Sequence, residues 1–81
     1  MRLDKYLKVS RLIKRRTVAN EACDGERVTV NGRQAKASYQ VKIGDIIEIG
    51  YSGRVVKVEV LAVEDHVGKA QAGALYRELA E

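Results

Sequence analysis

The chain has 81 residues, of which 46% are hydrophobic and 32% charged, with no proline and a formal net charge of +4. This length holds one domain and excludes a second domain with a hydrolase or transferase pocket, while the composition excludes a disordered chain. The charge is uneven, because residues 1–16 have seven basic side chains and one acidic one, whereas the other 65 residues have eight basic and ten acidic side chains. We therefore expect a basic N-terminal segment attached to a mildly acidic body.

Two short helices are predicted first along the chain. Leu3 and Leu7 lie one helical turn apart and are expected to face the core, and Asp4 lies in the first turn, where the helix dipole favours an anion. Thr17 is the expected N-cap of the second helix and Gly25 its stop signal. The apolar side of this second helix is formed by Val18, Ala19, Ala22 and Cys23.

From Arg27 onward the hydrophobic pattern has a period of two, which is typical of strands. A predicted strand over Val28–Val30 is followed by Asn31-Gly32, a pair typical of a tight hairpin turn. A second turn at Gly44-Asp45 precedes a predicted strand over Ile46–Ile49.

The longest predicted strand covers Arg54–Val63, and Tyr51-Ser52-Gly53 is expected to close the hairpin that precedes it. After Gly68 the spacing becomes helical again and predicts a C-terminal helix with an apolar side of Ala72, Leu75, Tyr76 and Leu79. The order helix, helix, strands, helix indicates a single domain of the α+β class.

The basic segment is the most informative feature for function. Lys14, Arg15 and Arg16 stand directly before the expected start of the second helix, where backbone N–H groups and the helix dipole add to their positive charge. The same surface is expected to include Arg2, Lys5 and Arg11. A solvated charged face is the alternative, but the near absence of acids from this fifth of the chain favours nucleic-acid binding. A membrane surface is disfavoured, because the small body needs the apolar side of the first helix for its core.

Evidence for an enzyme, a metal or a cofactor is weak. Cys23 is the single cysteine, and with the single histidine, His66, it cannot supply the four ligands of a structural zinc site. We expect Cys23 to be a small buried hydrophobe and His66 to lie in an exposed polar turn. Charged residues interrupt any apolar segment near the N-terminus, so we expect no signal peptide. Uncharged runs fall far below the ~20 apolar residues of a membrane span, and the single cysteine favours a reduced compartment, so we expect no membrane span and a cytoplasmic location.

Two other RNA-binding motifs fit poorly. Gly50-Tyr51-Ser52-Gly53 matches the G-x-x-G loop of a KH domain, but that loop joins two helices, whereas here it separates two strand patterns. The four tyrosines are scattered and do not form the paired aromatic strands of an RRM.

Several segments occur together in one order. They are Arg2-Leu3-Asp4-Lys5, residues 10–17 (SRLIKRRT), Val28-x-Val30-Asn31-Gly32, Lys36, Ser38 and Gly44-Asp45. This combination resembles the alpha-L RNA-binding motif, the family named after small-subunit ribosomal protein S-four. The resemblance covers about residues 1–63 and implies an alpha-L RNA-binding domain in which two N-terminal helices pack on a small, mostly antiparallel sheet. The helical spacing after Gly68 adds the expectation that residues 64–81 form a C-terminal helix docked on the same domain. It implies that Asp4 orients neighbouring basic side chains and that RNA is bound by Arg2, Lys5, Arg11, Lys14, Arg15, Arg16 and Lys36.

Within this family, residues 1–17 are similar to the RqcP family of small bacterial ribosome-associated quality-control factors, which is related to the fifteen-kilodalton heat-shock protein. That resemblance implies a non-enzymatic factor that binds large-subunit rRNA and peptidyl-tRNA on obstructed large ribosomal subunits and stabilises the tRNA in the P site. RqcH is then a partner on the same particle, where it adds alanine to the stalled chain. The alternatives are a heat-shock-type recycling factor of the large subunit and the RNA-binding subunit of an RNA-modifying enzyme.

Overall fold

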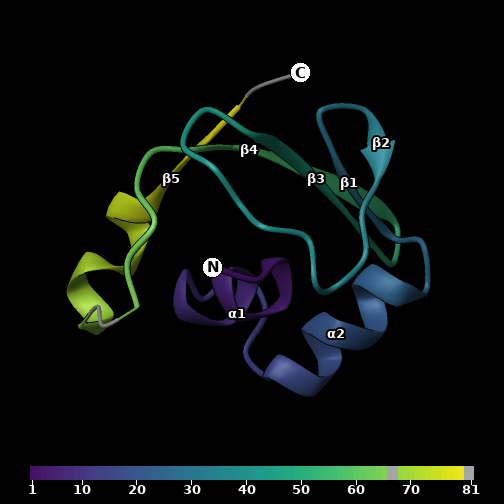
Figure 1. Ribbon diagram of the computed structural model, residues 1–81, viewed down its shortest axis with the longest axis horizontal. Helices are drawn as coiled ribbons and strands as arrows, with labels where there is room; N and C mark the ends of the chain where they lie inside the picture. Colours follow the sequence, from purple (N-terminus) through teal and green to yellow (C-terminus); the bar gives the residue numbers. More distant parts are fainter. Residues whose placement is uncertain (66–67, 80–81) are drawn as a thin grey trace.

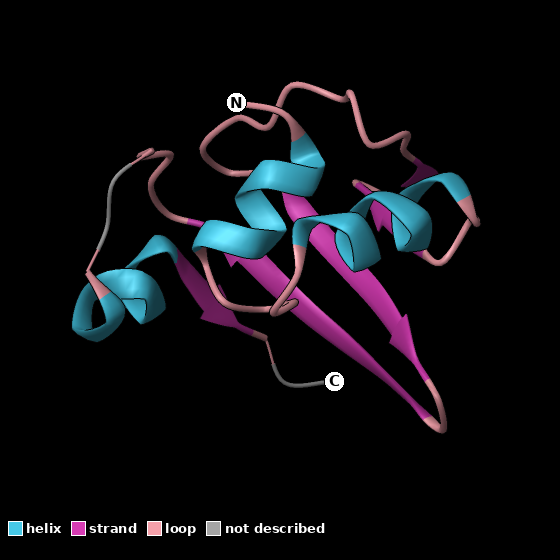
Figure 2. Cartoon of the chain, turned by 90° about the horizontal axis from the view of Figure 1, so that it is seen from below, coloured by secondary structure: helices cyan, strands magenta, loops and turns pink. Residues whose placement is uncertain are grey.

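The computed structural model describes residues 1–65 and 68–79, and within them it has two α-helices, one 3-10 helix and a five-stranded sheet. Helices α1 (Leu3–Val9) and α2 (Arg16–Asp24) lie side by side against one face of the sheet (Figures 1 and 2). The strands are β1 (Val28–Val30), β2 (Arg33–Gln34), β3 (Ile46–Tyr51), β4 (Arg54–Val60) and β5 (Tyr76–Glu78). Their order is β2-β1-β3-β4-β5 and all neighbours are antiparallel, which confirms the predicted α+β fold.

The core lies between the helices and the sheet. Leu3, Tyr6 and Leu7 of α1 are completely buried, as predicted for the two leucines. They meet the inward-facing residues of the sheet, among which Ile47 of β3 and Val58 of β4 are direct cross-strand partners. This contact fixes the position of α1, and with it the position of the basic residues at its N-terminal end.

The start of α2 differs from the prediction. Arg15 is the N-cap and makes no side-chain cap hydrogen bond, and Arg16 is the first helical residue, so the prediction of Thr17 as N-cap is wrong. The guanidinium of Arg16 instead reaches the carboxylate of Asp4 on α1. A contact between the two helices therefore stabilises the start of α2. The residues around the cap do not predict this contact, because its partner lies on α1. The predicted end is confirmed, with Gly25 as the C-cap.

Both predicted hairpins are present. Asn31 and Gly32 have φ angles of 54° and 83° and join β1 to β2 as a two-residue turn, the geometry in which a glycine is least strained. The side chain of Asn31 accepts a hydrogen bond from the amide of Ile46, which ties this turn to β3. Tyr51 pairs with Arg54 across the second turn, so the G-x-x-G segment is a β-hairpin, as interpreted from the sequence.

The C-terminal segment corrects the prediction of a helix through Leu79. A 3-10 helix, η1, covers Lys69–Leu75, but Tyr76–Glu78 form strand β5 on the outer edge of β4. The amides of Leu61 and Ala62 donate to the Leu75 carbonyl, so β4 also ends three residues before the predicted Val63. The edge of β4 offers unpaired backbone groups, and pairing with them outweighs a helical tendency that Gly73 already weakens.

Candidate nucleic-acid interface

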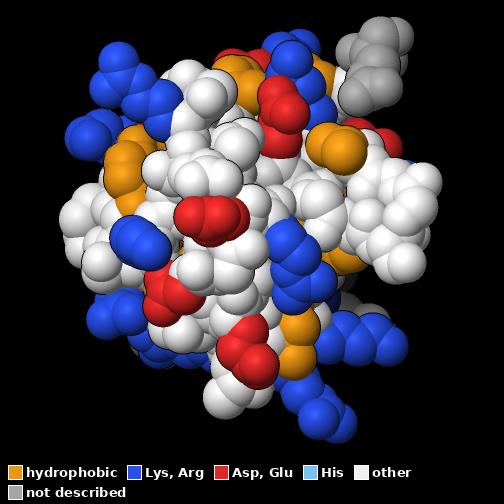
Figure 3. Space-filling model, turned by 90° about the vertical axis from the view of Figure 1, so that its right-hand side faces the viewer, with side chains coloured by type: hydrophobic (Ala, Val, Ile, Leu, Met, Phe, Trp, Pro, Cys, Tyr) orange, Lys and Arg blue, Asp and Glu red, His pale blue; other side chains and the backbone are white. Residues whose placement is uncertain are grey.

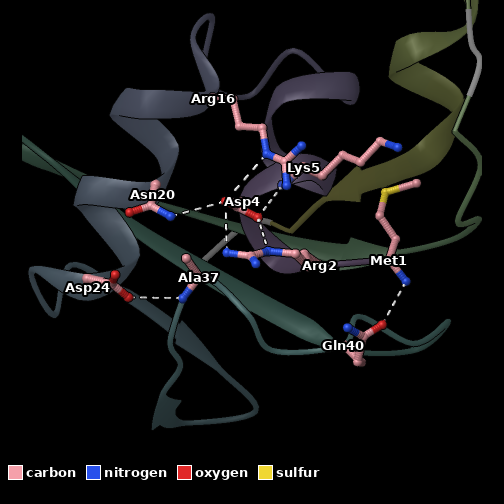
Figure 4. A network of polar contacts seen from close by, with 9 residues as sticks. All are labelled: Met1, Arg2, Asp4, Lys5, Arg16, Asn20, Asp24, Ala37 and Gln40. Atoms are coloured by element: carbon pink, nitrogen blue, oxygen red, sulfur yellow. Dashed lines mark hydrogen bonds and ion pairs between the residues drawn. The ribbon is translucent and has the colours of Figure 1, made fainter.

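A buried carboxylate, Asp4, joins the two helices at their basic ends. It is 2% exposed, and its Oδ1 accepts hydrogen bonds from Arg2 Nε at 3.1 Å and from the Lys5 amide at 2.9 Å. Its Oδ2 accepts from Arg16 Nε at 3.4 Å and from Asn20 Nδ2 at 3.2 Å. Figure 4 shows Arg2 and Arg16 approaching Asp4 from opposite sides, with Asn20 reaching it from α2. The prediction that Asp4 orients neighbouring basic side chains is therefore confirmed by the geometry.

The electrostatics of this network keep Asp4 ionised. Burial on its own raises the pKa of the carboxyl, but hydrogen bonds from Asn20, Arg2 and the Lys5 amide, with the charge of Arg16, outweigh it and lower the pKa below 3.8. One negative charge is thus shared by two guanidinium groups, and the side chains of Arg2 and Arg16 remain nearly half exposed, at 45% and 47%. The cluster keeps a net positive charge that faces solvent.

The loop between β2 and β3 completes this surface. Ala37 accepts a hydrogen bond from the Asp4 amide at 3.2 Å, and its own amide donates to Asp24 Oδ1 at 3.1 Å (Figure 4). The Tyr39 carbonyl accepts from the Leu3 amide at 2.8 Å. Lys36 immediately precedes Ala37, whose backbone bridges Asp4 near the start of α1 and Asp24 at the end of α2.

The other predicted residues are placed in two ways. Lys5 Nζ forms an ion pair with Asp65 at 3.1 Å, so its charge is partly matched by an acid. Arg11, Lys14 and Arg15 lie on the exposed connection between α1 and α2, and within the described part of the chain none of their side chains has an ion pair. Arg11 has a φ of 63°, which turns the chain sharply after α1. The structure thus brings Arg2 and Arg16 together at Asp4, and leaves Arg11, Lys14 and Arg15 along the connection between the helices. Lys36 lies in the separate loop between β2 and β3.

Acidic side chains also occur on this side of the molecule. Figure 3, which faces the right-hand side of Figure 1, shows Lys and Arg mostly towards the margin with Asp and Glu between them. Asp24 accepts the hydrogen bond of the Ala37 amide, so this acid positions the backbone of the loop that contains Lys36. Asn20 was not singled out from the sequence as part of a site, although its spacing of four residues from Arg16 puts both on one side of α2.

Of the two residues considered for catalysis, the structure describes Cys23. Cys23 is buried, and burial together with the charges of Asp4 and Asp24 raises the pKa of its thiol to about 11, so the nucleophilic thiolate is disfavoured. His66 lies outside the described residues. Among residues 1–65 and 68–79 no group of three or more His, Cys, Asp and Glu side chains could hold a metal ion. The helices in these ranges are also too short or too polar to cross a membrane.

Comparison with known families places this fold. The S4 domain family matches residues 1–47, which include both helices, the β1–β2 hairpin and the loop that follows it. The chain is therefore an S4-domain protein, and the Asp4 network lies wholly within the matched region.

Relatives match the whole domain. The chain is 54% identical over 76 residues to the RQC P-site tRNA stabilizing factor of Halalkalibacterium halodurans, which covers 94% of this chain and 86% of the relative. It is 49% identical over 81 residues to the RQC P-site tRNA stabilizing factor of Bacillus subtilis, with coverage of 100% and 94%. The chain belongs to the family of RQC P-site tRNA stabilizing factors.

A solved structure supports the same fold. The structure of heat shock protein 15 from Vibrio cholerae, described as trimeric, superimposes with a TM-score of 0.91 at 34% sequence identity and covers 99% of this chain and 82% of that chain. The region of likeness therefore extends beyond the S4 match into η1 and β5.

Proposed function

We propose that this chain is a non-enzymatic, cytoplasmic factor that binds large-subunit rRNA and peptidyl-tRNA and stabilises the tRNA in the P site of obstructed large ribosomal subunits. In this role it supports the addition of alanine to the stalled chain by RqcH on the same particle. The names of the relatives support the P-site role, and the S4 domain supports RNA binding.

The observation that carries the proposal is the shared carboxylate of Asp4. Structured RNA presents phosphates at fixed separations, and a protein that recognises it gains from cations held in a fixed arrangement. Arg2 and Arg16 are ordered by Asp4 before any ligand arrives, which lowers the entropic cost of binding. Arg11, Lys14, Arg15 and Lys36 extend the cationic surface for further phosphates, and Lys5 adds to it beside its ion pair.

The Arg16→Ala variant tests this proposal. We expect weaker co-sedimentation with purified large ribosomal subunits and a log-log salt slope for tRNA binding that is smaller by about 0.7 to 0.9, the value of one phosphate contact. Arg77→Ala is the matched control, because Arg77 is also paired with a carboxylate, Glu59, but lies in β5. Equal co-sedimentation of the two variants contradicts a role for Arg16 in RNA binding.

The heat-shock-type alternative rests on the likeness to heat shock protein 15. Affinity purification of the chain at moderate salt, followed by identification of the RNA and proteins on the recovered particles, separates the two functions. Large subunits with peptidyl-tRNA and RqcH support the P-site role. Large subunits without either favour recycling, and recovery of free protein or intact translating ribosomes contradicts both.

A further inference from the structure

A narrow cleft of about 260 Å³ lies on the other side of α2 from the Asp4 network. Its walls come from the connection between the helices, from α2 and from the end of β3, and they are mainly apolar: Leu12, Ile13, Val18, Ala22 and Ile49. Its volume is below the ~300–1,000 Å³ typical of sites for drug-sized ligands, so it suits one small group such as a single ring system.

The cleft has an aromatic wall in a fixed orientation. Tyr51 Oη donates a hydrogen bond to the Leu12 carbonyl at 2.7 Å, and the guanidinium of Arg54 lies 5.5 Å from the centre of the Tyr51 ring. Gly50 also lines the cleft, and its amide donates to the Arg27 carbonyl at 2.8 Å, so backbone rather than a side chain forms that part of the wall. Because Arg54 lies over one face of the Tyr51 ring, the opposite face is the surface on which a base stacks.

Cations flank the cleft. Lys14 and Arg27 both line it and are exposed, and no acidic side chain is among its described lining residues. Lys14 is continuous in the chain with Arg15 and Arg16, so an RNA backbone that follows these three cations passes the mouth of the cleft. An apolar slot with phosphate-binding groups at its mouth has the chemistry of a nucleotide site rather than that of a site for an aliphatic side chain.

We propose that this cleft binds one unstacked nucleobase of the RNA, with Tyr51 as the stacking surface and Lys14 and Arg27 on the adjoining phosphate. The proposal rests on the proposed RNA-binding function and adds to it a base-binding site separate from Arg2 and Arg16. Because stacking requires only a π-face, the site tolerates different bases.

Titration of the full chain with AMP and with ribose 5-phosphate, followed by NMR of backbone amides and methyl groups, tests the proposal. AMP is expected to bind about ten-fold more tightly, because only AMP has a base to stack. AMP is also expected to shift the signals of Val18, Ile49, Gly50 and Tyr51, which ribose 5-phosphate leaves unchanged.

Variants separate the base from the phosphate. Val18→Asn places a neutral polar group in the cleft and is expected to remove most of the preference for AMP, while Val55→Asn, at a valine 53% exposed on the uncovered face of the sheet, retains it. Lys14→Ala is expected to weaken both ligands equally. Equal binding of AMP and ribose 5-phosphate to the unchanged chain overturns the proposal.

Failure of the cleft proposal can be distinguished from failure of the proposed RNA-binding function. If AMP causes no shift in the cleft but Arg16→Ala still weakens tRNA binding, the cleft proposal fails and the RNA-binding function stands. If an acidic peptide containing leucine shifts the cleft signals and AMP does not, the cleft is assigned to a protein partner and the nucleobase proposal is overturned.

Discussion

The helical layer and the uncovered face of the sheet differ in how their basic residues are paired with acidic ones. On the helices, Arg2 and Arg16 share one buried carboxylate, so the cluster stays positive. On the uncovered face of the sheet, Lys57 is paired with Glu48 at 3.9 Å and Arg77 with Glu59, so each of these two cations has its own acid. The number of basic residues therefore says less about RNA binding than the number of cations that each acid must serve.

The largest expected effect comes from Asp4→Ala. Removal of a buried acceptor that serves two guanidinium groups, an amide side chain and a backbone N–H is expected to lower the free energy of unfolding by about 2–3 kcal/mol. It is also expected to weaken tRNA binding of the folded protein, since Arg2 and Arg16 lose their fixed arrangement. Urea denaturation and a tRNA-binding isotherm measure the two effects.

Asp45→Ala is the matched control for this change. Asp45 is also buried, and it accepts hydrogen bonds from Asn31, Tyr39 and the Lys42 amide, whereas no arginine of the described residues forms a hydrogen bond or ion pair with its side chain. The Asp45→Ala protein is expected to lose a similar amount of stability and to keep tRNA binding. Weakened tRNA binding of folded Asp45→Ala protein equal to that of Asp4→Ala means that general loosening of the fold, and not the order of the two arginines, sets the affinity.

Acidification is expected to have an intermediate effect on the free energy of unfolding. Burial raises the pKa of Asp45, but hydrogen bonds from the Lys42 amide, Tyr39 and Asn31 and the charge of Lys42 outweigh it, so this pKa is lowered below 3.8, as is that of Asp4. A native-state pKa below the unfolded value contributes stability that is present above about pH 5 and is lost as the pH falls through 3.8 and the native-state pKa. We therefore expect the free energy of unfolding to fall steeply in this acidic range.

Substitutions identify the carboxylates responsible for this pH dependence. Asp4→Asn and Asp45→Asn are each expected to be less stable than the unchanged chain near pH 7 and to show a shallower fall below pH 5, because each removes one titrating group. Urea denaturation repeated from pH 7 to pH 3 measures both slopes. Slopes equal to that of the unchanged chain assign the acid sensitivity to other carboxylates.

The sequence predicts the elements whose causes are local. The Asn31-Gly32 turn, the periodicity of β4 and the spacing of Leu3 and Leu7 each depend on neighbouring residues, and the structure has each feature. The start of α2 and strand β5 depend instead on contacts between distant segments. Apolar residues at positions 72, 75, 76 and 79 fit a helix by spacing, but the open edge of β4 decides the conformation of residues 76–78.

The same division holds for the candidate site. The density of cations predicts that the N-terminal segment forms the candidate site, and the family resemblance predicts that Asp4 orients neighbouring basic side chains. The partners of Asp4 require the packing of α1 against α2, so Asn20 and the Asp24 anchor of the Lys36 loop are seen only in the folded chain. The ion pair of Lys5 with Asp65 spans 60 residues of sequence, and no local pattern predicts it.

The smallest effect on stability and on tRNA binding is expected from substitutions on the uncovered face of the sheet. The ion pair between Arg77 and Glu59 is exposed, with the Arg77 side chain 64% accessible, and such pairs contribute about 0–1 kcal/mol because water and salt screen them. In a double-mutant cycle of Arg77→Ala and Glu59→Ala, the coupling energy is expected to fall in this range and to shrink as salt is added. tRNA binding is expected to stay unchanged in Arg77→Ala, because Glu59 already neutralises Arg77 in the unchanged chain. A loss of tRNA binding in Arg77→Ala as large as that in Arg16→Ala removes the contrast between the two faces and moves part of the RNA surface to β5.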